Sequence, residues 1–125
     1  MVDTHCHLHF PQFKEDLEDI LEKIKEKFSF VVDVGISLKD SLKALSLALK
    51  RENIFSTFGI HPHEAKDANL KEFETAFRKL YPEYRHKIVA IGEAGLDFYR
   101  NLSPKKAQIE VFEFQIELAK KYKLP

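Results

Sequence analysis

The sequence is poor in the features that mark several protein classes. Its only cysteine is Cys6, so it has no intramolecular disulfide framework, and a reducing, cytoplasmic location is expected. No apolar run approaches the roughly 18 residues that a membrane span needs, and the N-terminus lacks the pattern of a signal peptide. Twenty basic residues balance twenty acidic ones, so no global basic field attracts nucleic acid. An anionic substrate would therefore need local positive charge, such as a bound cation.

The residues that are present suffice for one folded domain. The chain has 125 residues, of which 44% are hydrophobic, and eleven phenylalanines can fill a core. A domain usually takes about 100–200 residues, so we expect a single unit over residues 1–125.

Hydrophobic spacing predicts four strand–helix units of roughly 30 residues each. We expect a short buried first strand through His5 and His7, then strands at 29–35, 54–60 and 87–92. The helices are expected at about 13–28, 38–49, 69–80 and 104–122. Ser37 and Asp40 form a capping-box pattern, and Ser103 is expected to cap the last helix. The predicted apolar faces of the second and last helices are Leu38, Leu42, Leu45 and Leu49, and Ile109, Phe112, Ile116 and Ala119.

This alternation predicts a parallel sheet covered by helices, in which ligands bind at the carboxyl ends of the strands. Polar residues follow three of the four strands at such ends. His5 and His7 leave the first strand, the segment from Gly59 to His63 leaves the third, and the segment from Ile91 to Asp97 leaves the fourth. Their convergence on one rim indicates a functional site.

The residue types at this rim predict a metal site. His5 and His7 lie two apart on a strand and so project to one face, with their Cα atoms roughly 6.5–7 Å apart. Two histidines and Glu93 resemble the three-ligand set of a catalytic zinc, which keeps a position open for water. Such a set suits zinc or manganese better than calcium. Cys6 alternates to the opposite face and is expected in the core, whereas His9 follows the strand and is given no ligand role.

Three segments carry a resemblance to a known family. They are Asp3-Thr4-His5-Cys6-His7-Leu8, Gly59-Ile60-His61-Pro62-His63 and Ile91-Gly92-Glu93-Ala94-Gly95-Leu96-Asp97-Phe98-Tyr99-Arg100. Together with the segment from Gln108 to Ala119 and the final Leu124-Pro125, they strongly resemble the TatD family of metal-dependent hydrolases. The resemblance implies that the chain is the parallel (βα)₄ N-terminal half of a TIM-like (βα)₈ barrel of the amidohydrolase type. It also implies one or two divalent metal ions (Zn, Mn or Mg) and a 3′–5′ exodeoxyribonuclease activity on a nucleic acid substrate, with DNA expected.

The resemblance also assigns roles to single residues. His5 and His7 would bind a metal ion, and Glu93 would be both a ligand and the catalytic carboxylate. His63 and Arg100 would lie near the substrate phosphate, and Asp97 would fix the loop after Glu93. Asp33 has no ligand role, and a hydrogen bond to a polar barrel interior is one interpretation of it.

Other readings stay open. The family's remaining ligands, two histidines and an aspartate, lie on later strands, and a full barrel takes about 250 residues. The chain is then an N-terminal half that is inactive alone, or a homodimer in which two copies pair through their open sheet edges. A non-catalytic folding or assembly fragment is one alternative. Another is a phosphoesterase of the polymerase-and-histidinol-phosphatase family, which also opens with a His-x-His strand. DNA, RNA and aminoacyl-tRNA esters are not distinguished as substrates.

Overall fold

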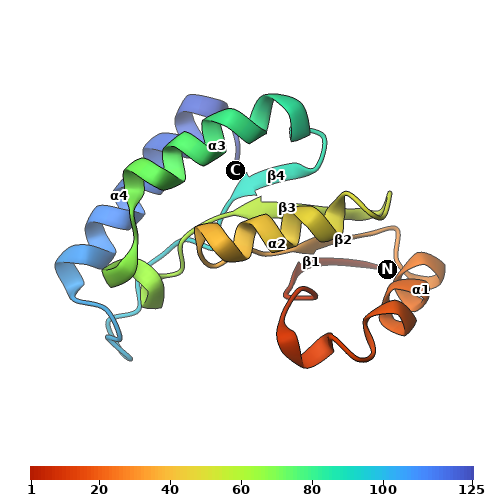
Figure 1. The fold of residues 1–125 in the computed structure, drawn as a ribbon. Helices are drawn as coiled ribbons and strands as arrows, with labels where there is room; N and C mark the ends of the chain where they lie inside the picture. The colour runs from red at the N-terminus through yellow and green to blue at the C-terminus, as the bar shows by residue number, and fades with distance from the viewer.

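In the computed structural model, which describes residues 1–125, four strands form one parallel sheet in the order β1-β2-β3-β4 (Figure 1). All neighbouring strands pair in parallel, as the alternation predicted. The strands are β1 Val2–Cys6, β2 Phe30–Asp33, β3 Ile54–Phe58 and β4 Ile88–Ile91. The α-helices are α1 Leu17–Lys27, α2 Leu38–Ala48, α3 Leu70–Tyr84 and α4 Lys105–Tyr122, and two short 3₁₀ helices are η1 Pro11–Phe13 and η2 Pro62–Asp67.

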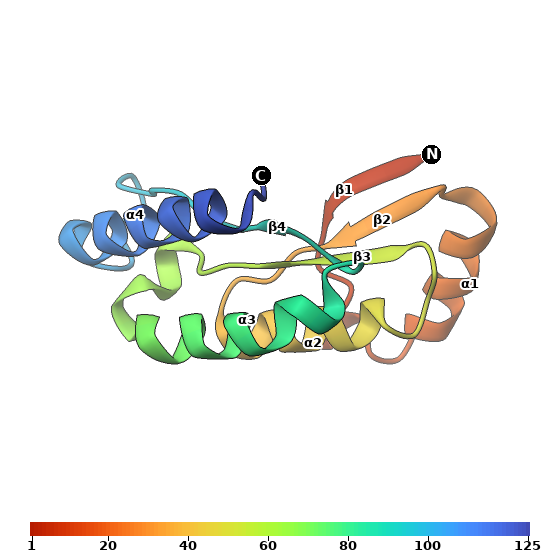
Figure 2. The same cartoon turned by 90° about the horizontal axis from the view of Figure 1, so that it is seen from above.

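Helices α2 and α3 cover one side of the sheet. Figure 2 shows them together along that side, with α1 near the end where β1 and β2 begin and α4 beside β4. None of the helices combines the length and the apolar character that crossing a membrane requires.

The buried apolar side chains form two separate cores. The larger core lies between the second half of the sheet and α3 and α4, where Phe58 packs edge-to-face on Phe73 and Phe77. The smaller core lies between α1, part of α2 and the first strands. Its members are Leu8, Leu21, Ile24, Val31, Leu47, Ala48 and Ile54.

The predicted burial of the first strand was wrong. Val2, Thr4 and His5 are exposed, because β1 is an edge strand that pairs only with β2. The third helix is also longer than predicted and continues through Pro82 to Tyr84.

The predicted apolar face of the second helix was wrong in part. Leu42 and Leu49 are exposed, whereas Ser41 and its neighbours Ala44 and Ala48 are buried. The helix lies so close to the end of β2 that a Cβ on Gly35 would be 2.3 Å from the Ser41 Oγ. Only small side chains fit this contact, so Leu42 and Leu49 turn outward, whereas Leu45 of the predicted face is buried in the larger core.

The predicted face of the last helix was wrong as well. Ile109 and Ile116 are each 42% exposed, and the buried side chains on α4 are Gln108, Val111, Gln115 and Leu118. The two glutamines are turned inward because their carboxamides bind backbone groups of two loops, which an apolar-spacing argument does not detect.

One of the two predicted caps is confirmed. The Ser37 Oγ accepts a hydrogen bond from the Asp40 N–H at 3.2 Å and caps α2, although the Asp40 carboxylate accepts from the Ile36 N–H instead of completing a capping box. Ser103 does not cap α4, which has Pro104 at its N-cap. The Ser103 Oγ donates to the His63 carbonyl at 2.7 Å, so it joins two loops instead.

Candidate metal centre

The side chains predicted as metal ligands meet at the carboxyl edge of the sheet. The His5 Nε2 lies 3.3 Å and the His7 Nε2 4.0 Å from the Glu93 Oε2. One potential ligand atom from each of the three residues lies within 4.8 Å of the other two. The structure therefore brings together a residue in β1, the residue just after it and a residue that follows β4, although 86 positions separate His7 from Glu93 in the sequence.

A bulge in β1 lies at the first histidine. Asp3 pairs with Val31 and Cys6 pairs with Asp33, so β1 uses one more residue than β2 over this stretch. The His5 N–H donates to the Asp3 Oδ1 at 2.9 Å, within its own strand. Bulges of this kind redirect side chains at the edges of sheets and beside active sites.

The hydrogen bonding of His7 selects the tautomer that a metal ligand needs. Its Nδ1 lies 2.8 Å from the Val34 carbonyl, which can only accept, so the Nδ1 carries the hydrogen. The Nε2 lone pair is then free and faces Glu93. The Phe10 ring stacks on the His7 imidazole with a centroid distance of 4.6 Å and an interplanar angle of 18°. The imidazole is thus oriented as in metal sites where the second ring nitrogen binds a carbonyl.

Backbone contacts across the end of β3 hold Glu93. The Glu93 N–H donates to the Gly35 carbonyl at 2.9 Å, and the Gly92 N–H donates to the Phe58 carbonyl at 2.8 Å. A Cβ on Gly59 would lie 2.0 Å from the Gly92 carbonyl carbon, so this close approach requires glycine. Glu93 is consequently held over the middle of the sheet edge, facing β1.

The three donors fit a divalent metal ion. Imidazole nitrogen and carboxylate oxygen are ligands of zinc and manganese. A tetrahedral ion with bonds of about 2.0–2.1 Å holds its ligand atoms about 3.3–3.4 Å apart. The 3.3 Å between His5 and Glu93 matches that spacing, whereas the 4.0 Å between His7 and Glu93 is wider, so these two side chains must come closer to bind one ion.

A fourth side chain, His61, faces the same carboxylate and was not predicted as a site residue. Its Nε2 lies 3.6 Å from the Glu93 Oε1. The His63 N–H donates to its Nδ1 at 3.1 Å, so the hydrogen of the neutral ring is on the Nε2, opposite to His7. Burial lowers the pKa of His61, which outweighs the opposing effect of the Glu93 charge and favours this neutral form. His61 therefore presents a hydrogen-bond donor to the site.

His63, which was predicted near the substrate phosphate, turns to another partner. Pro62 begins η2, and this 3₁₀ turn gives the two histidines different directions. The His63 Nε2 lies 2.6 Å from the Asp97 Oδ2. The His61 and His63 rings contact each other edge-to-face at 4.3 Å, so the two groups are neighbours. Both histidines lie in the Gly-Ile-His-Pro-His segment that marked the end of the third strand in the sequence. The sequence pattern does not distinguish them, and the geometry of the turn decides that His61 faces Glu93 and His63 faces Asp97.

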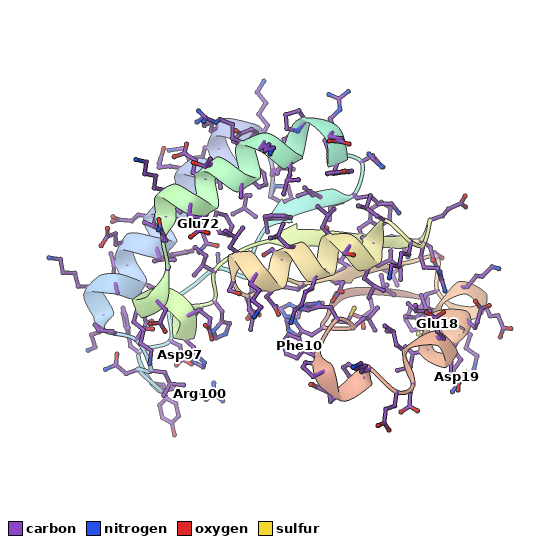
Figure 3. All side chains as sticks on the ribbon, viewed as in Figure 1. Phe10, Glu18, Asp19, Glu72, Asp97 and Arg100 are labelled. Carbon is purple, nitrogen blue, oxygen red and sulfur yellow. The ribbon has the colours of Figure 1, made fainter.

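Asp97 and Arg100 lie together on the loop after β4, at the lower left of the view, whereas Phe10 lies nearer its middle (Figure 3). The Asp97 carboxylate accepts hydrogen bonds from the Arg100 N–H at 3.0 Å and from the Arg100 Nη1 at 3.4 Å. The backbone bond from Arg100, followed by the bond to His63, lowers the pKa of Asp97 to about 2. These bonds support the predicted role of Asp97 in fixing the loop, and the Arg100 side chain stays 67% exposed.

Behind the site lies a buried polar group of which the sequence indicated only a hydrogen bond of Asp33 and not the part played by His9 and Asp40. The His9 side chain is only 3% exposed, with its Nδ1 2.7 Å from the Asp33 Oδ1 and its Nε2 2.7 Å from the Asp40 Oδ2. Burial alone lowers the pKa of His9, but the bonds and charges of the two carboxylates raise it overall. The Leu8 N–H also donates to the Asp33 Oδ1 at 2.9 Å. Asp33 thus fixes the segment after His7, and an aspartate within an apolar strand was its only sequence signal.

Cys6 points away from the metal centre, as predicted. It packs against the smaller core, and its thiol donates to the Val32 carbonyl at 3.2 Å. Burial, with smaller contributions from nearby carboxylates, raises the pKa of Cys6 to about 12. The thiol is therefore neutral at physiological pH and is not a metal ligand in this arrangement.

Comparison with known proteins places this fold and site in a family. The family model described as TatD related DNase matches residues 2–125. The chain is 39% identical over 126 residues to an uncharacterized metal-dependent hydrolase, YabD, of Bacillus subtilis, and covers 48% of it. It is 36% identical to the 3′-5′ ssDNA/RNA exonuclease TatD of Cronobacter sakazakii and covers 47% of it. In both matches the whole of this chain is covered.

A solved structure supports the same assignment. The TatD homologue YJJV of Escherichia coli superposes with a TM-score of 0.83 at 29% identity, over 100% of this chain and 48% of that one. The chain thus spans about half the length of the relatives it matches. The predicted fold class is confirmed, since the four parallel strand–helix units correspond to half of a TIM-like barrel. The chain belongs to the TatD family of metal-dependent hydrolases.

Proposed function

We propose that residues 1–125 form, as one unit, the metal-binding N-terminal half of a TatD-type phosphodiester hydrolase that removes nucleotides from the 3′ end of DNA. The observation that carries the proposal is the convergence of His5, His7 and Glu93 within 4.8 Å at the carboxyl edge of the sheet. Family membership adds the reaction class, because relatives that match the whole chain are named as a metal-dependent hydrolase and an exonuclease.

The proposed cofactor is one or two divalent ions. Two imidazole ligands favour zinc or manganese over magnesium, which prefers oxygen ligands. A bound dication lowers the pKa of a coordinated water to about 7 and polarises a phosphoryl oxygen.

The remaining roles follow from how each side chain is held. His5, His7 and Glu93 are the proposed ligands, with Glu93 also the catalytic carboxylate of the centre. His61 directs its Nε2–H toward the site and is proposed to donate a hydrogen bond to a substrate oxygen. Arg100 offers an exposed guanidinium that suits a phosphate group. His63 is proposed to act beside it, although its Nε2 is engaged by Asp97.

We further propose that two copies of the chain associate through their open sheet edges. β1 has a partner on one side only, and on the outer side of β4 the Ile91 N–H donates to the Pro125 carbonyl, as at the start of a further parallel pairing. Unpaired strand edges favour such pairing. Light scattering at micromolar concentration should give a dimer mass, and a monodisperse monomer would exclude this assembly. The cytoplasmic location stays a prediction, which rests on the presence of a single cysteine in the sequence.

Nucleotide release tests the proposed activity. The experiment follows 3′-labelled single-stranded DNA with manganese for the wild-type chain, for Glu93→Ala and for Glu113→Ala. Glu113 is an exposed glutamate on α4, so its variant controls for the loss of one negative charge. Release by the wild type and the control, but not by Glu93→Ala, is expected if this half assembles a working centre.

A non-catalytic fragment is the competing function, and the small donor set favours it. Only His5, His7 and Glu93 form a cluster that can hold a metal ion. Zinc or manganese binding without nucleotide release by any variant would assign the chain a metal-binding but inactive role. Absence of metal binding would reject the site itself.

A further inference from the structure

Helix α4 carries two glutamines whose side chains are as buried as the phenylalanines of the core. Gln108 is 0% and Gln115 1% exposed, and they lie seven positions apart on the inward face of the helix. Burying a carboxamide is costly unless its oxygen and nitrogen are hydrogen-bonded. Both side chains are bonded, and their partners are backbone groups of the loops that carry the site.

Gln115 holds the loop after β3 at a single residue. Its Oε1 accepts from the Ile60 N–H at 2.8 Å, and its Nε2 donates to the Ile60 carbonyl at 3.0 Å. The carboxamide thus pairs with both backbone groups of Ile60, as a neighbouring strand would. The next residue is His61, whose Nε2 faces Glu93.

Gln108 holds the loop after β4 in the same way. Its Oε1 accepts from the Asp97 N–H at 2.8 Å, and its Nε2 donates to the Asp97 carbonyl at 3.3 Å and to the Ser103 carbonyl at 2.8 Å. The Asp97 carboxylate in turn binds His63 and Arg100.

The hydrogen bonds that join the two held loops do not involve the proposed metal ligands, although the His61 Nε2 lies 3.6 Å from the Glu93 Oε1. The His63–Asp97 pair and the Ser103 Oγ bond to the His63 carbonyl join them. The proposed ligands are His5 in β1, His7 just after it, and Glu93, the second residue after β4, whose N–H donates to the Gly35 carbonyl. The hydrogen bonds that hold His7 and Glu93, to the Val34 and Gly35 carbonyls, are therefore different from those that the two glutamines make to the loops.

From this arrangement we propose that Gln115 is a positioning residue for His61, and Gln108 a positioning residue for Asp97, His63 and Arg100. Helix α4 acts as the common support that sets substrate-contacting groups independently of the metal site. That His61 and Arg100 contact substrate rests on the proposed function. That the two glutamines position them does not depend on it.

The test compares Gln115→Met with Gln108→Met in the full 125-residue chain. Methionine keeps the length of the side chain and removes both hydrogen-bonding groups, and Gln12→Met, on an exposed position, is the control. Ring ¹⁵N signals of the histidines report the tautomer and surroundings of each imidazole, and a zinc titration reports the metal site. Gln115→Glu and Gln108→Glu keep the oxygen that accepts from the loop N–H, and serve if a methionine variant does not fold.

The expected pattern is a crossed one. Gln115→Met moves the ring signals of His61 more than those of His63, and Gln108→Met does the reverse. The zinc Kd stays within a factor of about three in both, below the 10–100-fold loss typical of partners that orient metal ligands. The control changes neither. Equal effects of both variants on all histidines, or a zinc Kd raised tenfold or more, would overturn the proposal. Failure of zinc to bind the wild type would count against the proposed function alone, since the ring signals are read without metal.

Discussion

Gly59 and Gly92 touch backbone to backbone, since a Cβ on Gly59 would lie 2.0 Å from the Gly92 carbonyl carbon. The contact joins the end of β3 to the peptide that leads into Glu93. A glycine with no room for a methyl group therefore determines where the proposed catalytic carboxylate lies relative to His5 and His7.

Substituting Gly59→Ala is expected to damage both stability and the metal site. The added methyl must displace backbone, and overpacking of this kind costs about 1–3 kcal/mol of unfolding free energy. Urea unfolding measures this cost, and a zinc titration measures the displacement of Glu93. Gly95→Ala is the matched control, because a Cβ there meets nothing within 4 Å. Equal stability of the two variants would contradict the argument from close approach.

Removing a proposed ligand is expected to weaken metal binding without unfolding the chain. His5 is exposed on the edge strand, so His5→Ala leaves the cores intact. The zinc Kd should rise by at least the roughly 10–100-fold that loss of an orienting partner costs. His86→Ala, on an exposed position before β4, should bind as the wild type does. An unchanged titration for His5→Ala would reject the site.

The Asp97 carboxylate is expected to make stability depend on pH in the acid range. The pKa of Asp97 is about 2 in the folded chain against an ordinary value of 3.8. The ionised carboxylate therefore adds to the free energy of unfolding above pH 3.8, and this gain is lost as the pH falls toward 2. The difference in unfolding free energy between the wild type and Asp97→Asn should therefore be largest near neutral pH and shrink below pH 3.8. Urea titrations at pH 7, 4 and 2.5 measure it, and a constant difference would show that the carboxylate charge is not involved.

The buried Lys87 is expected to matter for folding and not for the metal site. Its ammonium donates to the carbonyls of Arg51, Glu52 and Ile54 at 2.6, 3.0 and 3.0 Å, at the amino ends of the strands. Burial lowers the pKa of Lys87. Lys87→Met leaves these carbonyls without their donor, at a cost of about 1–3 kcal/mol. In thermal unfolding, Lys87→Met should have a lower Tm than the control Lys79→Met, whose lysine is exposed. Both variants should bind zinc as the wild type does.

The alternation of strands and helices could be predicted because apolar spacing is a local property of the sequence. This alternation also predicted where the site lies, since parallel strands place their carboxyl ends on one edge of the sheet. The same reasoning failed for α4. The bonds that turn Gln115 inward join it to Ile60, 55 residues away, and such a partner leaves no periodic signal.

The candidate site could be predicted in part for the same reason. His5, His7 and Glu93 were found because their strands predicted a common edge. His61 was missed because a single 3₁₀ turn at Pro62 decides which of two neighbouring histidines faces Glu93. Cap geometry and turn type act over two or three residues, and apolar spacing does not contain that information.

The division of the interior into two cores has a consequence for cooperativity. His5 and His7 belong to the part built on the smaller core, whereas Glu93 follows β4 in the larger one. A metal ion bound by all three groups would link a residue pair beside the smaller core to a residue beside the larger one. Because such an ion binds only the folded chain, zinc is expected to raise the free energy of unfolding of both cores together.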